Sequence, residues 1–470
     1  MTTNTQILIP RRAILAGLGA LPFLPRRLSA EAALAATPPS FGDLAADAPK
    51  DAELAAVFRD LNTGDLLASR NGQLALPPAS TLKIVTALFA LQRLGPDYRF
   101  VTRVMQSGDR LILAGGGDPA LDTDALADMA RRLAATKPGV PQRFAVWGGA
   151  LPRIDQIAPG QAEYLPYNPT ISGMILNFNR VHLEWRRQDK GGYSLSLQAR
   201  ARSQSPRAYT VTAVTRAGTR PLMTHQIKDG KEIWSIAQGA LGRNGSRWLP
   251  IRQPELYAGD VFQTLCRAQG LVLPAPEVIA DLPDDARELT RIESPPLRDI
   301  LRDMMEFSTN LTAEVVGLAA SGAQSIPASA EVMRDWLSST GVAGEMYFHD
   351  HSGLSPQNRI SAETLVEVMS GPGRAAGLRD LMKHIPVLDE RGKRIASPVR
   401  IDAKTGTLNF VSNLAGYAEG GDGRILVFAI FCADPEKRAR SEGQELPAGM
   451  ISWVKRAKSL QQRLILSQAG

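Results

Sequence analysis

The chain has 470 residues, too many for one compact hydrophobic core, so we expect two or three domains. Its hydrophobic content of 44% and charged content of 21% are typical of a folded protein and exclude a disordered chain. The formal net charge of +7 includes four arginines near the N-terminus, and no basic cluster follows them, so nucleic acid is not expected as a partner.

Residues 1–32 have the order of an export signal. Arg11 and Arg12 precede a short apolar run, Ala13 to Leu24, and small residues follow as far as Ala32. The run is too short to span a bilayer, and the arginine pair favours the twin-arginine route. The alternative is a buried apolar helix at the N-terminus.

A hairpin and a helix are predicted next. Residues 54–61 and 66–69 read as strands on either side of the turn 62–65. The helix begins at Ser80 and ends at Gly95-Pro96, and we expect it to bury one apolar stripe, formed by Leu82, Val85, Leu88, Phe89 and Leu91. Taken alone, Ser80 is a candidate N-cap and Lys83 a solvated charge.

The chain between residues 98 and 249 has a different texture. Short alternating runs, separated by Gly, Asp and Pro clusters, predict mostly β structure with one amphipathic helix over residues 122–135. We interpret 98–249 as one or more inserted domains outside the catalytic chemistry. The flanking segments 33–97 and 250–470 then form the second unit.

After residue 250 helical patterns return, and the tail predicts two strands, 413–420 and 423–434, before a last amphipathic helix over 449–466. That helix either packs on its own sheet or lies on a membrane surface, so membrane association is at most peripheral. Cys266 and Cys432 each sit in an apolar run, which predicts two buried free thiols rather than a disulfide.

Three short motifs lie far apart in the chain. They are Ser80-x-x-Lys83, Ser308-Thr309-Asn310 in a helical region, and Lys404-Thr405-Gly406 at the beginning of a strand. Each is weak alone. In this order they form the set found in β-lactamases and penicillin-binding proteins.

The residue types suit acyl transfer by a covalent serine enzyme. A serine hydroxyl needs a base within hydrogen-bond reach, and residues i and i+3 of a helix share a face, so Lys83 can activate Ser80. Lys83 takes the proton only if burial and a nearby cation lower its pKa, and Lys404 is the candidate cation. Ser308 offers a hydroxyl that relays a proton to the leaving amine, and Asn310 offers an amide that holds Lys83 and the substrate.

The third motif predicts substrate contacts. Lys404 and Thr405 suit a terminal carboxylate, and Gly406 allows a close backbone approach because it lacks a Cβ. The backbone N–H groups of Ser80 and Thr407 are the candidate oxyanion donors.

The segments PPASTLKIVTALFALQRLGPDYRF, LNFNRVHLEW, FSTNLTAE and KTGTLNFVSNLAGYAEG resemble the class C low-molecular-mass penicillin-binding proteins, the D-alanyl-D-alanine carboxypeptidase/endopeptidase family. The resemblance covers nearly the whole chain after the signal. It implies an α+β fold: an antiparallel sheet flanked by helices, as in β-lactamases and transpeptidases, with a large insertion between the first two motifs. It also implies that Ser80, Lys83, Ser308, Asn310, Lys404 and Thr405 carry the catalytic roles of the family.

Two features depart from the family pattern. The segment HIPVLDERGKRIASPVRIDAKTG lacks the usual Gly-Thr-Leu turn before the third motif, and His351 stands where the family tends to have a small residue. The run His349-Asp350-His351 has no third metal ligand near it in the sequence, so we interpret it as solvated or packed rather than as a metal site. No cofactor or metal is expected.

The sequence therefore predicts an exported serine hydrolase of the cell wall that cleaves D-Ala-D-Ala termini or D-amino-acid cross-links, with β-lactams as inhibitors. One alternative is a β-lactamase or esterase with the same site. Another is a non-catalytic wall-binding protein in which the insert is the working part.

Overall fold

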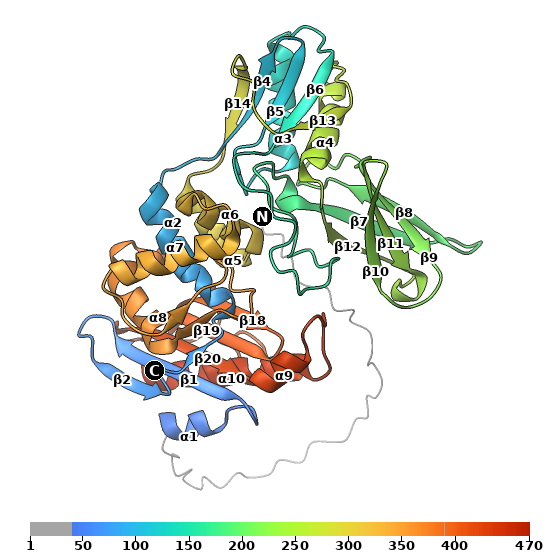
Figure 1. Cartoon of the computed structure of the whole chain (residues 1–470). Coiled ribbons are helices and arrows are strands. Elements are labelled where there is room, and N and C mark those ends of the chain that lie inside the picture. Colours follow the sequence, from blue (N-terminus) through green and yellow to red (C-terminus); the bar gives the residue numbers. More distant parts are fainter. Residues whose placement is uncertain (1–39, 390) are drawn as a thin grey trace, which may run out of the picture. The chain divides into compact units, whose positions relative to one another are not determined.

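The computed structural model describes residues 40–389 and 391–470 (Figure 1). The predicted export signal lies outside these residues. Within them, no helix is both long enough and apolar enough to cross a membrane.

A six-stranded antiparallel sheet has the order β17-β18-β19-β20-β1-β2 (Figure 1). The predicted hairpin and the two predicted C-terminal strands are confirmed in it. Its strands are β1 (Glu53–Asp60), β2 (Leu66–Arg70), β17 (Lys383–Ile385), β18 (Arg400–Leu408), β19 (Val411–Glu419) and β20 (Ile425–Ala433).

Alternate residues of β1 pack on opposite faces of this sheet, as the period of two requires. Ala56 and Phe58 belong to the cluster that includes α1 (Phe41–Ala46) and α10 (Met450–Ala469). Trp453 and Leu464 of α10 are buried in that cluster. The prediction that the last helix packs on its own sheet is therefore confirmed. Cys266 and Cys432 are free and buried, as predicted.

The other face carries a layer of helices, with Ala55 and Val57 of β1 in its core. A small sheet lies beside this layer, with the order β15-β16-β3. The elements are α2 (Lys83–Leu94), α5 (Leu297–Phe307), α6 (Asn310–Ser321), α7 (Ile326–Ser339), α8 (Ala362–Val368), β3 (Ala75–Leu76), β15 (Met346–Tyr347) and β16 (Arg359–Ser361).

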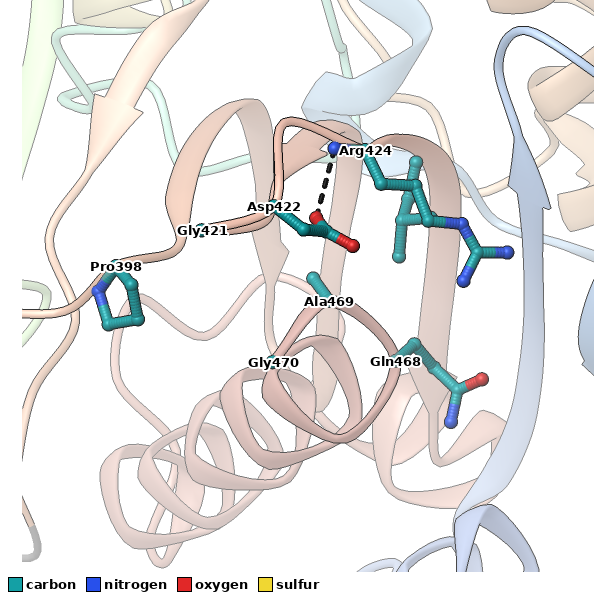
Figure 2. A pocket seen from close by; sticks show the side chains of 8 residues that line it. Pro398, Gly421, Asp422, Arg424, Gln468, Ala469 and Gly470 are labelled. Carbon is teal, nitrogen blue, oxygen red and sulfur yellow. Dashed lines mark hydrogen bonds between the residues drawn. The ribbon is translucent and has the colours of Figure 1, made fainter.

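A cavity of about 260 Å³ lies where the turn after β19 meets the C-terminal end of α10 (Figure 2). The backbone N–H of Arg424 donates to the Asp422 carboxylate at its edge. None of the residues of the three motifs lines this cavity.

The segment between α2 and α5 forms three more sheets, with orders β13-β6-β5-β4-β14, β12-β7-β8 and β10-β11-β9. The predicted helix over 122–135 is present as α3. The elements are β4 (Val101–Ser107), β5 (Arg110–Ala114), α3 (Thr123–Ala135), β6 (Arg143–Trp147), β7 (Arg180–Arg187), β8 (Tyr193–Gln198), β9 (Val211–Arg216), β10 (Met223–Lys228), β11 (Lys231–Ala237), β12 (Asn244–Pro250), α4 (Pro254–Ala268), β13 (Pro276–Ile279) and β14 (Arg287–Glu293).

The predicted boundary after residue 249 is wrong for the elements that follow it. β13 pairs with β6, and β14 pairs with β4, so both strands complete a sheet that begins before residue 249. Tyr257 and Phe262 of α4 are buried in the same cluster as α3. These elements therefore belong with the insert, which we propose to extend to Glu293.

The insert also contacts helices α2, α5 and α6, while its place outside the catalytic chemistry stays a prediction. Ile157, Ile171 and Ile175 are buried in the same cluster as α2, α5 and α6. The side-chain amide of Asn310 lies 3.4 Å from the backbone oxygen of Tyr167. A loop of the insert thus reaches a residue of the second motif.

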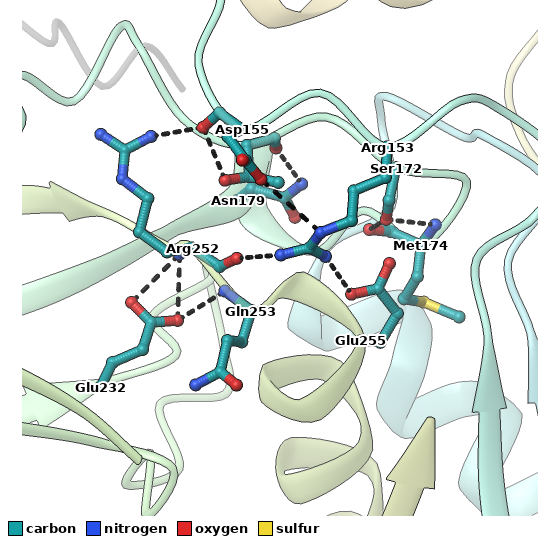
Figure 3. A network of polar contacts seen from close by, with 10 residues as sticks. Arg153, Asp155, Ser172, Met174, Asn179, Glu232, Arg252, Gln253 and Glu255 are labelled. Carbon is teal, nitrogen blue, oxygen red and sulfur yellow. Dashed lines mark hydrogen bonds and ion pairs between the residues drawn. The ribbon is translucent and has the colours of Figure 1, made fainter. Parts of the chain in front are cut away.

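Arg252 ties this loop to the insert (Figure 3). Its guanidinium donates to the backbone oxygens of Asp155, Glu163 and Asn168 at 2.7–2.9 Å. Its own backbone N–H donates to the buried carboxylate of Glu232 at 3.0 Å. The Arg252 side chain therefore holds the loop at three points between residues 155 and 168.

We expect Arg252→Ala to lower the free energy of unfolding by about 3 kcal/mol, because it leaves the backbone oxygens of Glu163 and Asn168 without a donor, while Asp155 keeps its bond from Thr170. Urea denaturation followed by circular dichroism measures this loss. Arg200→Ala is the matched control: its exposed ion pair with Glu184 contributes less than about 1 kcal/mol. Equal stability of Arg252→Ala and the wild type would contradict the role of the Arg252 side chain in holding the loop.

Candidate active site

Ser80 lies in a 3-10 turn, Ala79–Leu82, that leads directly into α2. No side-chain capping bond is formed here, so the N-cap interpretation of Ser80 is wrong. Lys83 is fully buried and is not a solvated charge. Helix α2 is buried around most of its circumference rather than along one stripe, since it packs between α5, α6 and α7.

The Lys83 amine is held by three oxygen atoms. Its Nζ lies 3.0 Å from Ser80 Oγ, 2.9 Å from Asn310 Oδ1 and 2.7 Å from the backbone oxygen of Ser352. Burial lowers the pKa of Lys83 to about 8, although the charges of Glu314 and Asp350 oppose this shift. A buried amine with a lowered pKa, in contact with a hydroxyl, can act as a base.

Ser308 lies between two helices rather than within one. Its φ of 59° is left-handed and ends α5, so the predicted helical region consists of two helices separated at this residue. Asn310 is the first residue of α6. The break places the Ser308 hydroxyl 3.0 Å from Lys404 Nζ, which also donates to the backbone oxygen of Thr405 at 2.8 Å.

Lys404 is buried within β18, well after the beginning of the strand where the sequence placed it. Burial lowers its pKa well below the ordinary value, and the neighbouring cations Lys83 and Lys383 lower it further. The two lysines are therefore close enough to repel each other. The pKa of Lys83 itself is lowered by burial, so the role of Lys404 as the cation that lowers it stays a prediction.

Gly406 brings β18 against the turn that carries Ser80. A Cβ on Gly406 would lie 2.8 Å from the backbone oxygen of Pro78 and 3.1 Å from the Ser80 nitrogen. The close approach predicted for Gly406 is thus made with the backbone of residues 78–80. Thr407, the next residue, is exposed. The oxyanion role of the Ser80 and Thr407 N–H groups and the substrate contact of Thr405 stay predictions.

The structure brings together Ser80, Lys83, Ser308, Asn310 and Lys404, although more than 300 residues separate the first from the last. Sequence reasoning missed Ser352, whose carbonyl holds Lys83, and the buried Glu314 beside it. Glu314 follows Asn310 by four residues on a helix, and that spacing was the available signal.

His351 is packed, in agreement with the interpretation of the His349-Asp350-His351 run. Its Nε2 lies 2.6 Å from Ser329 Oγ, and burial lowers its pKa to about 3, so the ring is neutral. Within residues 40–389 and 391–470, no group of three or more His, Cys, Asp or Glu side chains is placed to hold a metal ion.

A serine beside a buried lysine, with a second Ser–Lys pair whose lysine lies on strand β18 of an antiparallel sheet, is the arrangement typical of the penicillin-recognising serine enzymes. The sequence matches the D-Ala-D-Ala carboxypeptidase 3 (S13) family over residues 40–456, and the chain belongs to this family. The predicted family and enzyme class are confirmed.

Relatives and solved structures agree with this assignment. The chain is 30% identical to the D-alanyl-D-alanine carboxypeptidase of Actinomadura sp. (strain R39) over 426 residues, covering 80% of this chain and 76% of the relative. It is 23% identical over 424 residues to the D-alanyl-D-alanine carboxypeptidase DacB of Haemophilus influenzae, covering 83% of this chain and 87% of the relative.

The crystal structure of penicillin binding protein 4 (dacB) from Haemophilus influenzae has the same fold. Its TM-score is 0.71 at 18% identity, covering 90% of this chain and 99% of that one. The predicted α+β fold class is thereby confirmed.

Proposed function

We propose that the chain is an exported serine D-Ala-D-Ala carboxypeptidase that also cleaves D-amino-acid cross-links, through an acyl-enzyme on Ser80. The observation that carries the proposal is the placement of the buried Lys83 amine 3.0 Å from Ser80 Oγ. A serine hydroxyl becomes an effective nucleophile when a base of this kind removes its proton.

The contacts of Lys83 support its role as the base. A neutral amine has two N–H groups and one lone pair. Asn310 Oδ1 and the Ser352 carbonyl oxygen only accept hydrogen bonds, so they take the two N–H groups. The lone pair is then left for the Ser80 hydroxyl.

In the first step, Ser80 Oγ forms a bond to the carbonyl carbon of the penultimate D-Ala and its proton passes to Lys83. The C–N bond then breaks, and the terminal D-Ala leaves as an amine that receives a proton through the Ser308 hydroxyl. Lys404, 3.0 Å from Ser308 Oγ, and Thr405 bind the free carboxylate of the substrate. Water hydrolyses the ester and frees Ser80. The reaction needs no cofactor.

The proposed ligands are peptidoglycan stem peptides, their cross-links, and β-lactams. Membership of the S13 family supports the peptide substrate. The Haemophilus influenzae protein has also been solved in complex with a β-lactam, at a TM-score of 0.68 to this chain and 18% identity. The order of charged, apolar and small residues in 1–32 supports export to the periplasmic or cell-wall space.

A product assay tests the reaction. Purified pentapeptide stems and cross-linked muropeptide dimers are supplied separately, and the release of D-Ala and of monomers is measured. Release of D-Ala from the stems supports the carboxypeptidase, and monomer release alone makes the protein an endopeptidase. If neither product forms while penicillin still acylates the protein, a β-lactamase or a sensor replaces the proposal.

A further inference from the structure

The segment Asp350–Gly353 lies against α2 at Lys83. The Ser352 carbonyl accepts from Lys83 Nζ at 2.7 Å, and the His351 carbonyl accepts from Thr86 Oγ1, also at 2.7 Å. Two donors of α2 are therefore satisfied by two consecutive carbonyl groups. The position of this segment determines where one acceptor of the Lys83 amine lies.

Glu314 holds the same two residues from the opposite side. Its Oε2 accepts from the His351 backbone N–H at 3.1 Å, and its Oε1 accepts from the Ser352 N–H at 2.9 Å. Glu314 lies on α6, one turn after Asn310, and its side chain is fully buried. Asn310 accepts another Lys83 N–H. Helix α6 thus controls two of the three oxygen atoms around Lys83, one directly and one through Glu314.

The segment also fits closely against the nucleophile's turn. Gly353 has a φ of +78°, and a Cβ there would lie 1.8 Å from the backbone oxygen of Ala79, the residue before Ser80. The Asp350 carboxylate accepts from the Gly353 N–H at 2.7 Å and from the Asn358 amide at 2.8 Å. A shift of Asp350–Gly353 would therefore change the contacts of both Lys83 and the turn that carries Ser80.

We propose that Glu314 is a positioning residue for Lys83: its carboxylate fixes the His351 and Ser352 peptides so that the Ser352 carbonyl takes one Lys83 N–H and directs the lone pair to Ser80. The proposal rests on the function proposed above, because it assigns Glu314 a task in the activation of Ser80. Glu314 acts on Ser80 through the Ser352 peptide and Lys83.

The charges around Glu314 add a second consequence. Lys83 faces it from α2, Asp350 and the neutral His351 face it from the loop, and Lys404 faces Lys83 from β18. Burial and Asp350 raise the pKa of Glu314 to about 8, whereas both of its oxygens accept N–H groups, a geometry that suits the carboxylate. We assign the charged form, which stabilises the Lys83 ammonium formed when Ser80 is acylated.

Glu314→Gln tests both consequences in the full chain. The amide nitrogen of Gln would face a backbone N–H, so the Ser352 carbonyl should move and the maximal rate of penicillin acylation should fall about 10- to 100-fold. Loss of the negative charge lowers the pKa of Lys83. The rising limb of the pH–rate profile should therefore move to lower pH.

Asp260→Asn is the matched control. Asp260 is a buried carboxylate that also accepts two consecutive backbone N–H groups, from Tyr209 and Thr210, but it lies in the insert. The Asp260→Asn variant should keep the wild-type pH–rate profile of acylation even if it is less stable. Glu314→Asp, which retains the charge, should keep the profile of the wild type, and it serves as the second variant if Glu314→Gln does not fold.

The proposal is overturned if folded Glu314→Gln is acylated with the wild-type rate and profile. It is also overturned if the rate falls with an unshifted profile, since a purely structural role would produce that result. Failure of penicillin to acylate the wild-type protein would instead contradict the function proposed above, so the two failures are distinguishable.

Discussion

Ser80→Ala is expected to abolish covalent labelling by penicillin, because the acyl-enzyme has no other oxygen to form on at this position. The Ser80 side chain is only half-buried, and the Lys83 amine lies 3.0 Å from its hydroxyl, so it is both accessible and activated. Intact-protein mass spectrometry after incubation with a labelled penicillin gives the mass increase of the wild type. Peptide mapping then locates the adduct.

Ser412→Ala is a suitable control, because Ser412 is a buried serine of β19 that has no role in the proposed reaction. It should be labelled as fast as the wild type if it folds. A label on any residue other than Ser80, or labelling of Ser80→Ala, would refute the assignment of the nucleophile.

Lys83→Arg should reduce acylation by about 10²- to 10⁴-fold, the usual contribution of a general base. Arginine keeps the positive charge but does not lose a proton in proteins, so it cannot accept the proton of Ser80. Lys404→Arg should retain a measurable fraction of the rate, because the proposed role of Lys404 is electrostatic. Stopped-flow measurement of acylation by a chromogenic β-lactam compares the two variants.

The pH dependence provides an independent check on Lys83. Since burial lowers the pKa of Lys83 to about 8, the neutral amine becomes the major form as the pH rises through that value. The acylation rate of the wild type should rise across the same range, and Lys83→Arg should lose this rise. Near wild-type acylation of Lys83→Arg would mean that another group is the base.

Local patterns in the sequence were sufficient for much of the fold. The alternation in β1 and the turn after it predicted the hairpin, and the glycines after β19 predicted the last antiparallel pair, because these contacts join neighbouring parts of the chain. The end of the insert was not predictable in this way. Strands β13 and β14 pair with β6 and β4, and such distant pairing leaves no local signal.

The three motifs were readable because their residue types are tied to one chemistry. The sequence by itself determined the family and predicted the nucleophile and the base. Only the tertiary structure decided how they are held. The left-handed conformation of Ser308 depends on packing between α5 and α6 rather than on a glycine. The burial of Glu314 was equally hidden, because glutamate is ordinarily exposed. Its two N–H donors come from a loop 37 and 38 residues further along, and that contact exists only once the chain has folded.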